Sequence, residues 1–268
     1  MSTFSVFYNK KKGIKEPAEK IIKQLKEKGY NITSPNHPES AFLLTLGGDG
    51  TVLNAVDRAI NHNLPILSVC LGKIGFLSEL SPKDIFWGIE KALQGKYKID
   101  SRKMICASIF RNHKKIKEGM GLNDAVVSSS RIARIVDIET YINSKKTALY
   151  RADGVIVATA TGSTAYNLSA GGTILPPSRK ELIITPICPH QINWKSQLIS
   201  PQKKITLKIH FPKKQAMLLT LDGQKHFPLR SEDEIKITCQ QKKVDFIRFK
   251  PYNFKKLLKE KLSFTSKS

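Results

Sequence analysis

The chain has 268 residues, of which 40% are hydrophobic and 25% are charged. These proportions are typical of a globular protein, and the length suffices for one large domain or two modest ones. No apolar run approaches the length of a membrane span, and the N-terminus lacks the apolar core of a signal peptide. We therefore expect a cytoplasmic protein without a membrane partner.

The formal net charge of +23 favours anionic partners such as nucleotides, polyphosphate, nucleic acid or acidic lipid surfaces. The lysines are spread along predicted helices and turns, and no basic run is clearly interleaved with the aromatic residues that RNA binding requires. The charge is interpreted as general surface composition, and no nucleic-acid partner is expected.

The cysteines are isolated in apolar segments, with neither a Cys-x-x-Cys pair nor a histidine at metal-ligand spacing. We expect buried, reduced thiols and predict no protein residue as a metal ligand. The four are Cys70, Cys106, Cys188 and Cys239.

In the first hundred residues, short apolar runs alternate with segments of helical periodicity. The third helix is expected to begin with Ser81 as N-cap and Pro82 in its first turn. This alternation predicts a parallel sheet covered by helices, with ligands beyond the carboxyl ends of the strands. The predicted strands are 4–8, 41–46 and 65–70, and the predicted helices are 16–28, 51–61 and 82–93.

The most informative segment is the Gly-Gly-Asp-Gly-Thr turn of residues 47–51. Its glycines free the backbone for close approach to a ligand, and the following helix N-terminus presents N–H groups that bind phosphate. Asp49 would repel such an anion, unless a metal bridges the two or the carboxylate removes a proton from a nucleophile. The turn therefore favours phosphoryl transfer, with an ordinary Gly/Asp turn as the alternative.

After about residue 100, short alternating runs separated by turn residues predict a mainly antiparallel β domain. The segment 253–262 is a lysine-rich helix that is expected to turn Phe254, Leu257 and Leu258 inward and to return to the first domain. The predicted strands of this half are 104–110, 133–142, 155–159, 205–211, 216–221 and 234–238.

A run of small hydroxyl residues and glycines, 161–172, follows the predicted strand 155–159. Ser163 and Thr164 are expected to cap a short helix that exposes Tyr166 near its first turn. An aromatic ring can stack on a base while hydroxyl and N–H groups read its edge. The run therefore favours a nucleoside pocket over capping alone.

Over residues 41–224, the motifs of the sequence and their order along the chain resemble those of the NAD kinase family. The run 161–172 is the most specific motif, whereas the Gly-Gly-Asp-Gly-Thr turn also occurs in diacylglycerol-type lipid kinases and phosphofructokinases. The segments that carry the resemblance are 47–51, 72–77, Asn123-Asp124, Arg151 with Asp153-Gly154, 161–172, Pro189-His190 and 221–224.

The resemblance implies an ATP-dependent NAD kinase, which phosphorylates the 2′-hydroxyl of the adenosine ribose of NAD to give NADP. It implies an α/β N-terminal domain with a Rossmann-like parallel sheet and a β-rich C-terminal domain, with NAD bound in the cleft between them. The expected bounds are 1–100 for the α/β domain, joined by a helix within 250–268, and 101–249 for the NAD-binding domain. A divalent cation, expected to be Mg²⁺ brought with the phosphoryl donor, and a homodimer or homotetramer are also implied.

By the same resemblance, Asp49 is the general base and, with Gly50, touches the dinucleotide. An alcohol is a weak nucleophile until a base takes its proton, and a positioned carboxylate contributes about 10²- to 10⁴-fold in rate. The chemistry of the residue type therefore agrees with the role that the resemblance implies.

The other implied contacts lie in the second half of the chain. Asn123 and Asp124 hold ribose hydroxyls, although the pair alone could equally form a turn. Arg151 lies near the phosphate being installed, Asp153 contacts a base or carboxamide, and Gln224 contributes a further contact. The adenosine pocket is lined by Thr164, Ala165, Tyr166, Asn167, Leu168 and Ser169.

Two other functions remain open on the sequence: a lipid kinase of the diacylglycerol type that shares the turn, and a non-catalytic nucleotide-binding protein. The donor also remains open among ATP, another nucleoside triphosphate and polyphosphate. Lys195-Ser196 stands where the family commonly shows Arg-Pro, and Lys lacks the bidentate fork of Arg.

Overall fold

The computed structural model describes residues 3–10, 13–34, 39–72, 75–129, 135–191, 194–212 and 215–262. The chain divides into two compact units. Unit 1 comprises Met1–Ser101 and Val244–Ser268, and unit 2 comprises Arg102–Lys243.

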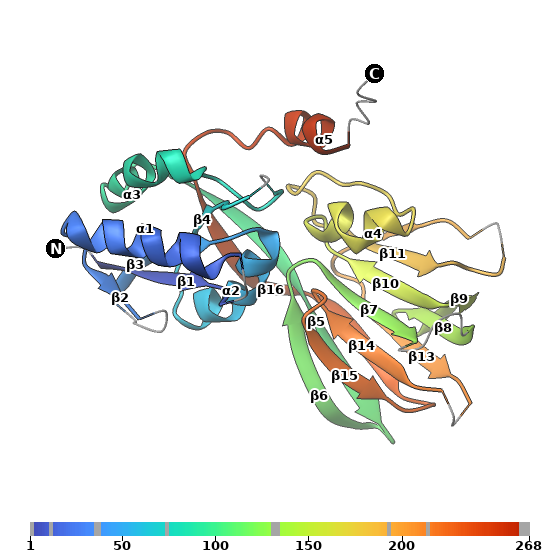
Figure 1. Cartoon of the computed structure of the whole chain (residues 1–268). Coiled ribbons are helices and arrows are strands. Elements are labelled where there is room, and N and C mark those ends of the chain that lie inside the picture. The colour runs from blue at the N-terminus through green and yellow to red at the C-terminus, as the bar shows by residue number, and fades with distance from the viewer. Residues whose placement is uncertain are drawn as a thin grey trace. The chain divides into compact units, whose positions relative to one another are not determined.

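Unit 1 contains a parallel sheet with the strand order β2-β1-β3-β4-β16 (Figure 1). Every neighbouring pair in this part of the sheet is parallel, including the pairing of Phe246 in β16 with Ile66 in β4. The strands are β1 (Thr3–Tyr8), β2 (Ile32–Thr33), β3 (Ser40–Leu46), β4 (Ile66–Val69) and the last residues of β16 (Glu234–Arg248).

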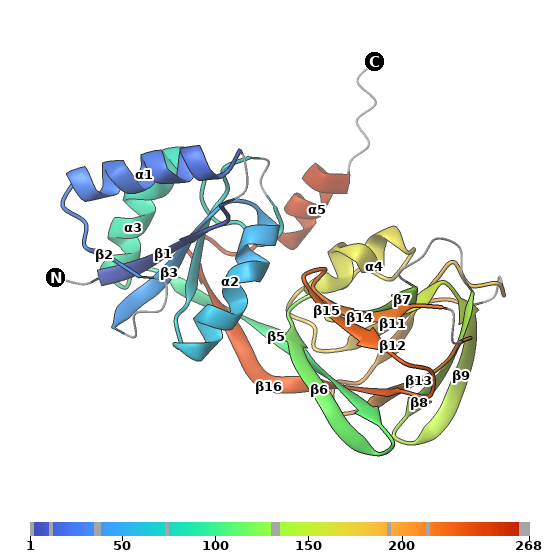
Figure 2. The ribbon, with the colours of Figure 1, turned by 60° about the horizontal axis from the view of Figure 1, so that its bottom comes forward.

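Helices cover both faces of this sheet, as the alternating pattern predicts. Helices α1 (Lys15–Glu27) and α3 (Ile85–Leu93) pack in one core with alternate residues of β1, β3 and β4. Buried Leu43 and Ile66 have the opposite parity and face α2 (Asp49–Asn61), which lies on the side of the sheet away from α1 (Figure 2). The predicted α/β fold with a parallel sheet is confirmed.

Three details of unit 1 differ from the sequence-based prediction. Helix α2 begins at Asp49 and not at Thr51, so the aspartate lies in the first helical turn. A 3-10 turn, Pro82–Asp84, precedes α3, and the Ser81 hydroxyl donates to the Asp84 carboxylate at 2.6 Å instead of capping the backbone. In α5 (Phe254–Leu262), the predicted inward residues are half-buried, and none is fully buried.

Unit 2 is a sandwich of two mainly antiparallel sheets, which confirms the predicted β-rich domain. One sheet has the order β12-β11-β10-β7-β14-β15, and the other contains β16-β13-β8-β9 with the hairpin β5-β6 beside β16. The strands are β5 (Lys98–Arg111), β6 (Lys114–Gly121), β7 (Asp124–Ser129), β8 (Val136–Ile142), β9 (Lys145–Ala152), β10 (Gly154–Ala158), β11 (Leu182–Ile187), β12 (Gln197–Ile199), β13 (Ile205–His210), β14 (Met217–Leu221) and β15 (Lys225–Leu229).

The core of unit 2 is formed by alternate residues of both sheets, for example Val155 and Val157 of β10 against Ile205 and Leu207 of β13. The outer face of the six-stranded sheet is also apolar, and Ile156 and its neighbours there pack against Ala160, Ala170 and Leu175. The segment that contains α4 (Tyr166–Ser169) therefore covers this outer face (Figure 1). Of the predicted strand 133–142, residues 133 and 134 lie outside the described residues, Ile135 is not in a strand, and β8 begins at Val136.

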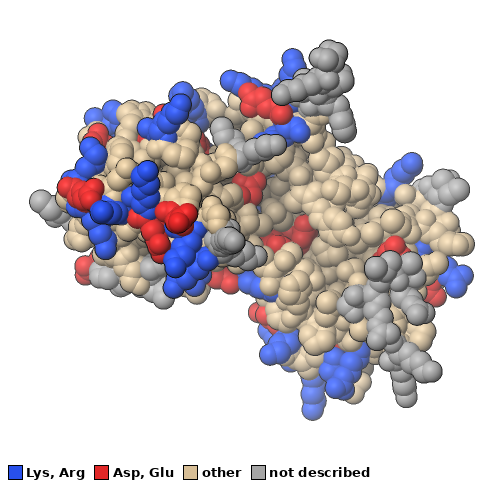
Figure 3. Space-filling view, viewed as in Figure 1, with Lys and Arg blue, Asp and Glu red and all other residues tan. Residues whose placement is uncertain are grey.

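The thiols and the surface charge refine two further expectations. Cys70 is buried, but Cys106 and Cys239 are half-buried and Cys188 is exposed, so the expectation of four buried thiols is wrong for these three. Basic side chains on the face shown in Figure 3 are scattered among acidic ones. Within the described part of the chain, no helix combines the length and the apolar character needed to cross a bilayer.

Gly154 allows a stability test of the sandwich. An added Cβ there would lie 2.3 Å from the carbonyl oxygen of Val127 in β7, which the strand ladder holds in place. Gly154→Ala is therefore expected to lower the free energy of unfolding by about 1–3 kcal/mol, measured by chemical denaturation. Gly72→Ala is the control, because no atom lies within 4 Å of its added Cβ. Equal losses in both variants would contradict this packing.

Candidate functional site

The glycine-rich turn connects β3 directly to α2. Gly47 has φ +151°, and a Cβ at this residue would lie 2.2 Å from the Thr51 hydroxyl oxygen, so only glycine fits there. Gly48 is the N-cap of α2, and Gly50 is exposed in its first turn. The turn therefore places the N-terminus of a 13-residue helix at the carboxyl end of β3.

Asp49 lies in this first turn, and both oxygens of its carboxylate accept main-chain hydrogen bonds. Phe76 N–H donates to Oδ2 at 2.8 Å, and Leu77 N–H donates to Oδ1 at 3.2 Å. Gly75 packs so closely that an added Cβ would lie 1.9 Å from Oδ1. These two hydrogen bonds fix the orientation of the Asp49 carboxylate. Because a carboxylate has about four acceptor positions, Asp49 keeps the capacity to accept a proton. None of the salt bridges found among the described residues involves it.

In unit 2, Asp222 organises the predicted Asn-Asp pair. Its carboxylate accepts hydrogen bonds from the main-chain N–H groups of Leu122, Asn123 and Asp124, at 2.8, 2.7 and 3.2 Å. Asp222 lies in the left-handed region, with φ +53°, in the turn between β14 and β15. The sequence analysis included this residue in the segment 221–224 but gave it no role, although an Asp-Gly pair after an alternating apolar run was available as a turn signal.

The strand end at Asn123 is held from the other side by residues that follow β10. Thr159 N–H donates to Asn123 O at 2.8 Å, and the Thr159 hydroxyl donates to Leu122 O at 2.6 Å. A Cβ on Gly162 would lie 2.1 Å from Asn123 O. The glycine is therefore required for the close approach of the 161–172 run to the Asn-Asp pair, and two predicted motifs meet at this point.

Asp124 is a buried carboxyl group, 4% exposed. Burial, together with the negative charge of Asp222, raises its pKa to about 7. Burial likewise raises the pKa of Asp222, although its three N–H donors act in the opposite direction. Among the described residues, no hydrogen bond to the Asp124 carboxylate is found. Such a group is a typical feature of a ligand-binding site.

The 161–172 run uses most of its polar side chains to fold itself. The expected capping by Ser163 and Thr164 is wrong, because the Ser163 hydroxyl bonds Ala160 O and Leu175 N and the Thr164 hydroxyl bonds Thr161 O. Asn167 is fully buried, with its amide donating to Ser163 O and Thr173 O and accepting from the Thr185 hydroxyl.

Tyr166 differs from its neighbours in α4, because 47% of its surface is exposed, as predicted. Burial raises the pKa of its phenol, and the charges of Cys188, Asp153 and Asp124 act in the same direction. Thr164, Ala165 and Leu168 are half-buried, and Ser169 is exposed. Tyr166 is thus an exposed aromatic side chain of this segment.

Arg151 and Asp153 lie at the opposite end of β10 from Asp124. Gly154 pairs with Ile187, whereas Ala158 at the far end pairs with Asp124, a separation of roughly 15 Å along the strand. The Arg151 side chain is 62% exposed and its Nε donates to Asp137 at 3.1 Å. Gln224 follows Asp222 in the turn at the Asp124 end. The structure therefore brings Asn123, Asp124 and Gln224 together, and places Arg151 and Asp153 apart from them.

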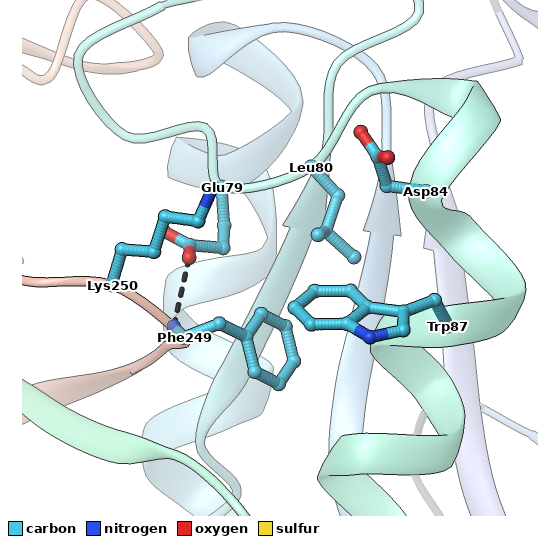
Figure 4. Close-up of a pocket in the computed structure, with 6 residues that line it drawn as sticks. All are labelled: Glu79, Leu80, Asp84, Trp87, Phe249 and Lys250. Atoms are coloured by element: carbon cyan, nitrogen blue, oxygen red, sulfur yellow. Dashed lines mark hydrogen bonds between the residues drawn. The ribbon is translucent and has the colours of Figure 1, made fainter.

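One cavity lies in unit 1, and another lies in unit 2 beside Arg151. A cavity of about 370 Å³ in unit 1 is lined by none of the predicted site residues; Trp87 and Phe249 form its aromatic wall (Figure 4). A cavity of about 360 Å³ in unit 2 is lined by Arg151, Asp137 and two histidines, His190 and His210. Among the described residues, no three His, Cys, Asp or Glu side chains form a metal-binding group.

Two family models match the chain. Residues 37–97 match the ATP-NAD kinase N-terminal domain, and residues 122–249 match the ATP-NAD kinase C-terminal domain. The NAD kinase of Carboxydothermus hydrogenoformans is 41% identical over 221 residues, which cover 82% of this chain and 79% of that protein. The NAD kinase of Desulforamulus reducens is 34% identical and covers 98% of this chain and 97% of its own length.

Two solved structures share the fold. A crystal structure of yeast NADH kinase complexed with NADH has a TM-score of 0.86 at 23% identity, and covers 100% of this chain and 89% of that one. An NAD kinase from Archaeoglobus fulgidus in complex with ATP has a TM-score of 0.75 at 25% identity, with 96% and 97% covered. These likenesses extend over both units of the chain.

The pKa of Asp124 predicts a pH dependence of stability. Its carboxyl group has a pKa of about 7 when folded and about 3.9 when unfolded, so between these values the folded state binds more protons. Stability therefore falls as pH rises through this window and becomes level above about pH 7. Asp124→Asn lacks this titration, so its free energy of unfolding should fall less between about pH 5 and about pH 8. Denaturant titrations at both pH values test this, and parallel behaviour of the two proteins would contradict it.

Proposed function

The chain belongs to the NAD kinase family, and from this premise we propose that it transfers a phosphoryl group from ATP to the 2′-hydroxyl of the adenosine ribose of NAD, giving NADP. The observation that carries the proposal is the carboxylate of Asp49, which lies in the first turn of a helix that follows Gly47 and Gly48 and forms no ion pair with a described residue. The two family matches span both units and favour this reaction over lipid phosphorylation.

In this proposal, Asp49 accepts the proton of the 2′-hydroxyl as the oxygen attacks the γ-phosphorus of ATP. The bond between the γ-phosphorus and the β–γ bridging oxygen breaks, and ADP leaves. Main-chain N–H groups at the start of α2, around Gly48 and Gly50, favour the negative charge of the phosphates. The carboxylate is already oriented by two amides, so little reorganisation is needed when the alcohol binds.

NAD binding is proposed for the domain 101–249, with the α/β domain of 1–100 and 250–268 supplying Asp49. Asn123 and Asp124 are proposed to hold ribose hydroxyls, because Asp222 and Gly162 fix their backbone and the Asp124 carboxyl is buried without a described hydrogen-bond donor. Tyr166 is proposed to stack on the adenine. For Asn167 the support is indirect, since its amide is committed to Ser163, Thr173 and Thr185 and can only hold the segment in shape.

Arg151 is proposed to contact the phosphate that is installed, and Asp153 a base or carboxamide. The exposed ion pair of Arg151 with Asp137 is weak enough to be exchanged for a phosphate, because such pairs contribute about 0–1 kcal/mol. A homo-oligomer, dimer or tetramer, is proposed from the family resemblance and is measurable by sedimentation equilibrium.

A divalent cation, Mg²⁺, is proposed to arrive with ATP. No residue of this chain is assigned as a ligand of the cation, because Mg²⁺ usually keeps several waters and binds substrate phosphates. When bound, the cation would neutralise the charge of the phosphates. A cytoplasmic location is proposed because all four cysteines are free thiols.

Asp49→Asn tests the proposed base. An amide cannot take up the proton, and its NH₂ group cannot accept the second of the two main-chain hydrogen bonds. NADP formation is expected to fall by about 10²- to 10⁴-fold while NAD still binds, as measured by a coupled NADP assay and by calorimetry. Asp57→Asn, on the same helix, is the matched control and should retain activity. Turnover close to wild type in Asp49→Asn would remove Asp49 from this role.

A further inference from the structure

We propose that Tyr252 and Arg248 are positioning residues for Asp49, which act by holding the peptide segment whose amides orient its carboxylate. The inference rests on the proposed role of Asp49 as base. Both residues lie in the C-terminal part of unit 1, at the end of β16 and just beyond it, about 200 residues from Asp49 in the sequence. Neither was predicted from the sequence.

The segment 76–78 is bonded on both of its sides. Its N–H groups, from Phe76 and Leu77, donate to Asp49. Its first and last carbonyl groups, those of Phe76 and Ser78, bond to the C-terminal segment, while Leu77 O accepts from the Ser68 hydroxyl at 2.7 Å. The Tyr252 hydroxyl donates to Phe76 O at 3.0 Å, and Arg248 Nη1 donates to Ser78 O at 3.1 Å. The segment is therefore fixed between the proposed base and two side chains from the other end of unit 1.

The contact through Tyr252 is rigid because it passes through a single peptide group. Phe76 C=O and Leu77 N–H belong to the same planar peptide unit. Tyr252 holds the oxygen of that unit, and its N–H points at Asp49 Oδ1 at 3.2 Å. Rotation of the peptide plane would break both hydrogen bonds, and bonds at the two ends of one amide also polarise each other. The tyrosine hydroxyl therefore sets the direction of one of the two donors to Asp49.

Arg248 fixes the position of this segment, and it is itself fixed. Its side chain is 3% exposed, and it forms ion pairs with Glu79 at 3.0 Å and Asp100 at 3.2 Å. Its guanidinium lies 5.1 Å from the centre of the Tyr252 ring. Glu79, directly after the segment, also accepts a hydrogen bond from Phe249 N–H at 2.9 Å, as Figure 4 shows. The C-terminal segment is thus joined to both ends of the 76–79 stretch.

A purely structural role would make Tyr252 and Arg248 matter for folding and leave catalysis untouched. A positioning role instead predicts a change in the chemical step, since the Asp49 carboxylate would sample orientations that do not reach the hydroxyl. The KM for NAD would change little, because neither side chain is among the proposed NAD contacts. The split between kcat and KM therefore separates the two roles.

Tyr252→Phe is the test variant, because it removes the hydroxyl and keeps the ring beside Arg248. We expect kcat to fall about tenfold, a change comparable to the loss of one ordinary hydrogen bond, while the KM for NAD stays within about twofold of wild type. Hydrogen exchange at the amides of Phe76 and Leu77, followed by mass spectrometry on peptides spanning 75–80, should be faster than in wild type. Tyr30→Phe is the matched control, because it removes a hydroxyl of the same unit that lies 3.5 Å from the exposed Glu90 carboxylate.

Arg248→Lys provides a second variant that keeps the buried charge. Its amine cannot reach Glu79, Asp100 and Ser78 O with a fork geometry, so kcat should fall with the same faster exchange. Unchanged kcat in both folded variants, or unchanged exchange at 75–80 in Tyr252→Phe, overturns the inference. Asp49→Asn distinguishes failure of this inference from failure of the proposed function. If Asp49 is not the base, Asp49→Asn retains turnover, and this result does not depend on the exchange rates of the segment.

Discussion

The structure depends on one constraint: a carboxylate at a helix N-terminus has both oxygens bonded to main-chain amides of a neighbouring loop. Asp49 occurs where three glycines allow the backbone to approach a ligand, so its charge would be out of place in a simple phosphate site. The amides of Phe76 and Leu77 hold the carboxylate without neutralising its charge, whereas an ion pair with lysine would neutralise it. A fixed carboxylate that forms no ion pair with a described residue, beside helix N–H groups, is suited to take a proton from an alcohol while an anion binds next to it.

A second aspartate in unit 2 uses the same chemistry for a different purpose. Asp222 accepts three main-chain hydrogen bonds, and its capacity is spent on fixing the backbone of Asn123 and Asp124. Burial of Asp124, together with that nearby charge, raises its pKa to about 7. Asp49, the proposed base, accepts two main-chain hydrogen bonds, whereas Asp222 accepts three and fixes the backbone of the Asn123-Asp124 pair.

Local pattern was enough to predict much of the fold, since the alternation of apolar runs located β1, β3, α1 and α2 to within two residues. It also located the turn that contains Asp49 and the exposed ring of Tyr166. It could not predict that the side chains of Ser163, Thr164 and Asn167 bond to main-chain groups of their own segment, because hydroxyl and amide side chains have several partners within reach in any folded turn. Nor could it predict the links from Asp222 to 122–124 or from Tyr252 to Phe76, since contacts over such sequence separations leave no periodic signal.

The most direct test of the account is a crystal structure of the protein with NAD bound, refined at a resolution that defines the Asp49 carboxylate. The account predicts an Asp49 oxygen within about 3 Å of the 2′-hydroxyl of the adenosine ribose, with the hydrogen bonds from Phe76 and Leu77 intact. An Asp49 carboxylate bonded to a lysine or arginine, or turned away from that hydroxyl in the complex, would contradict it.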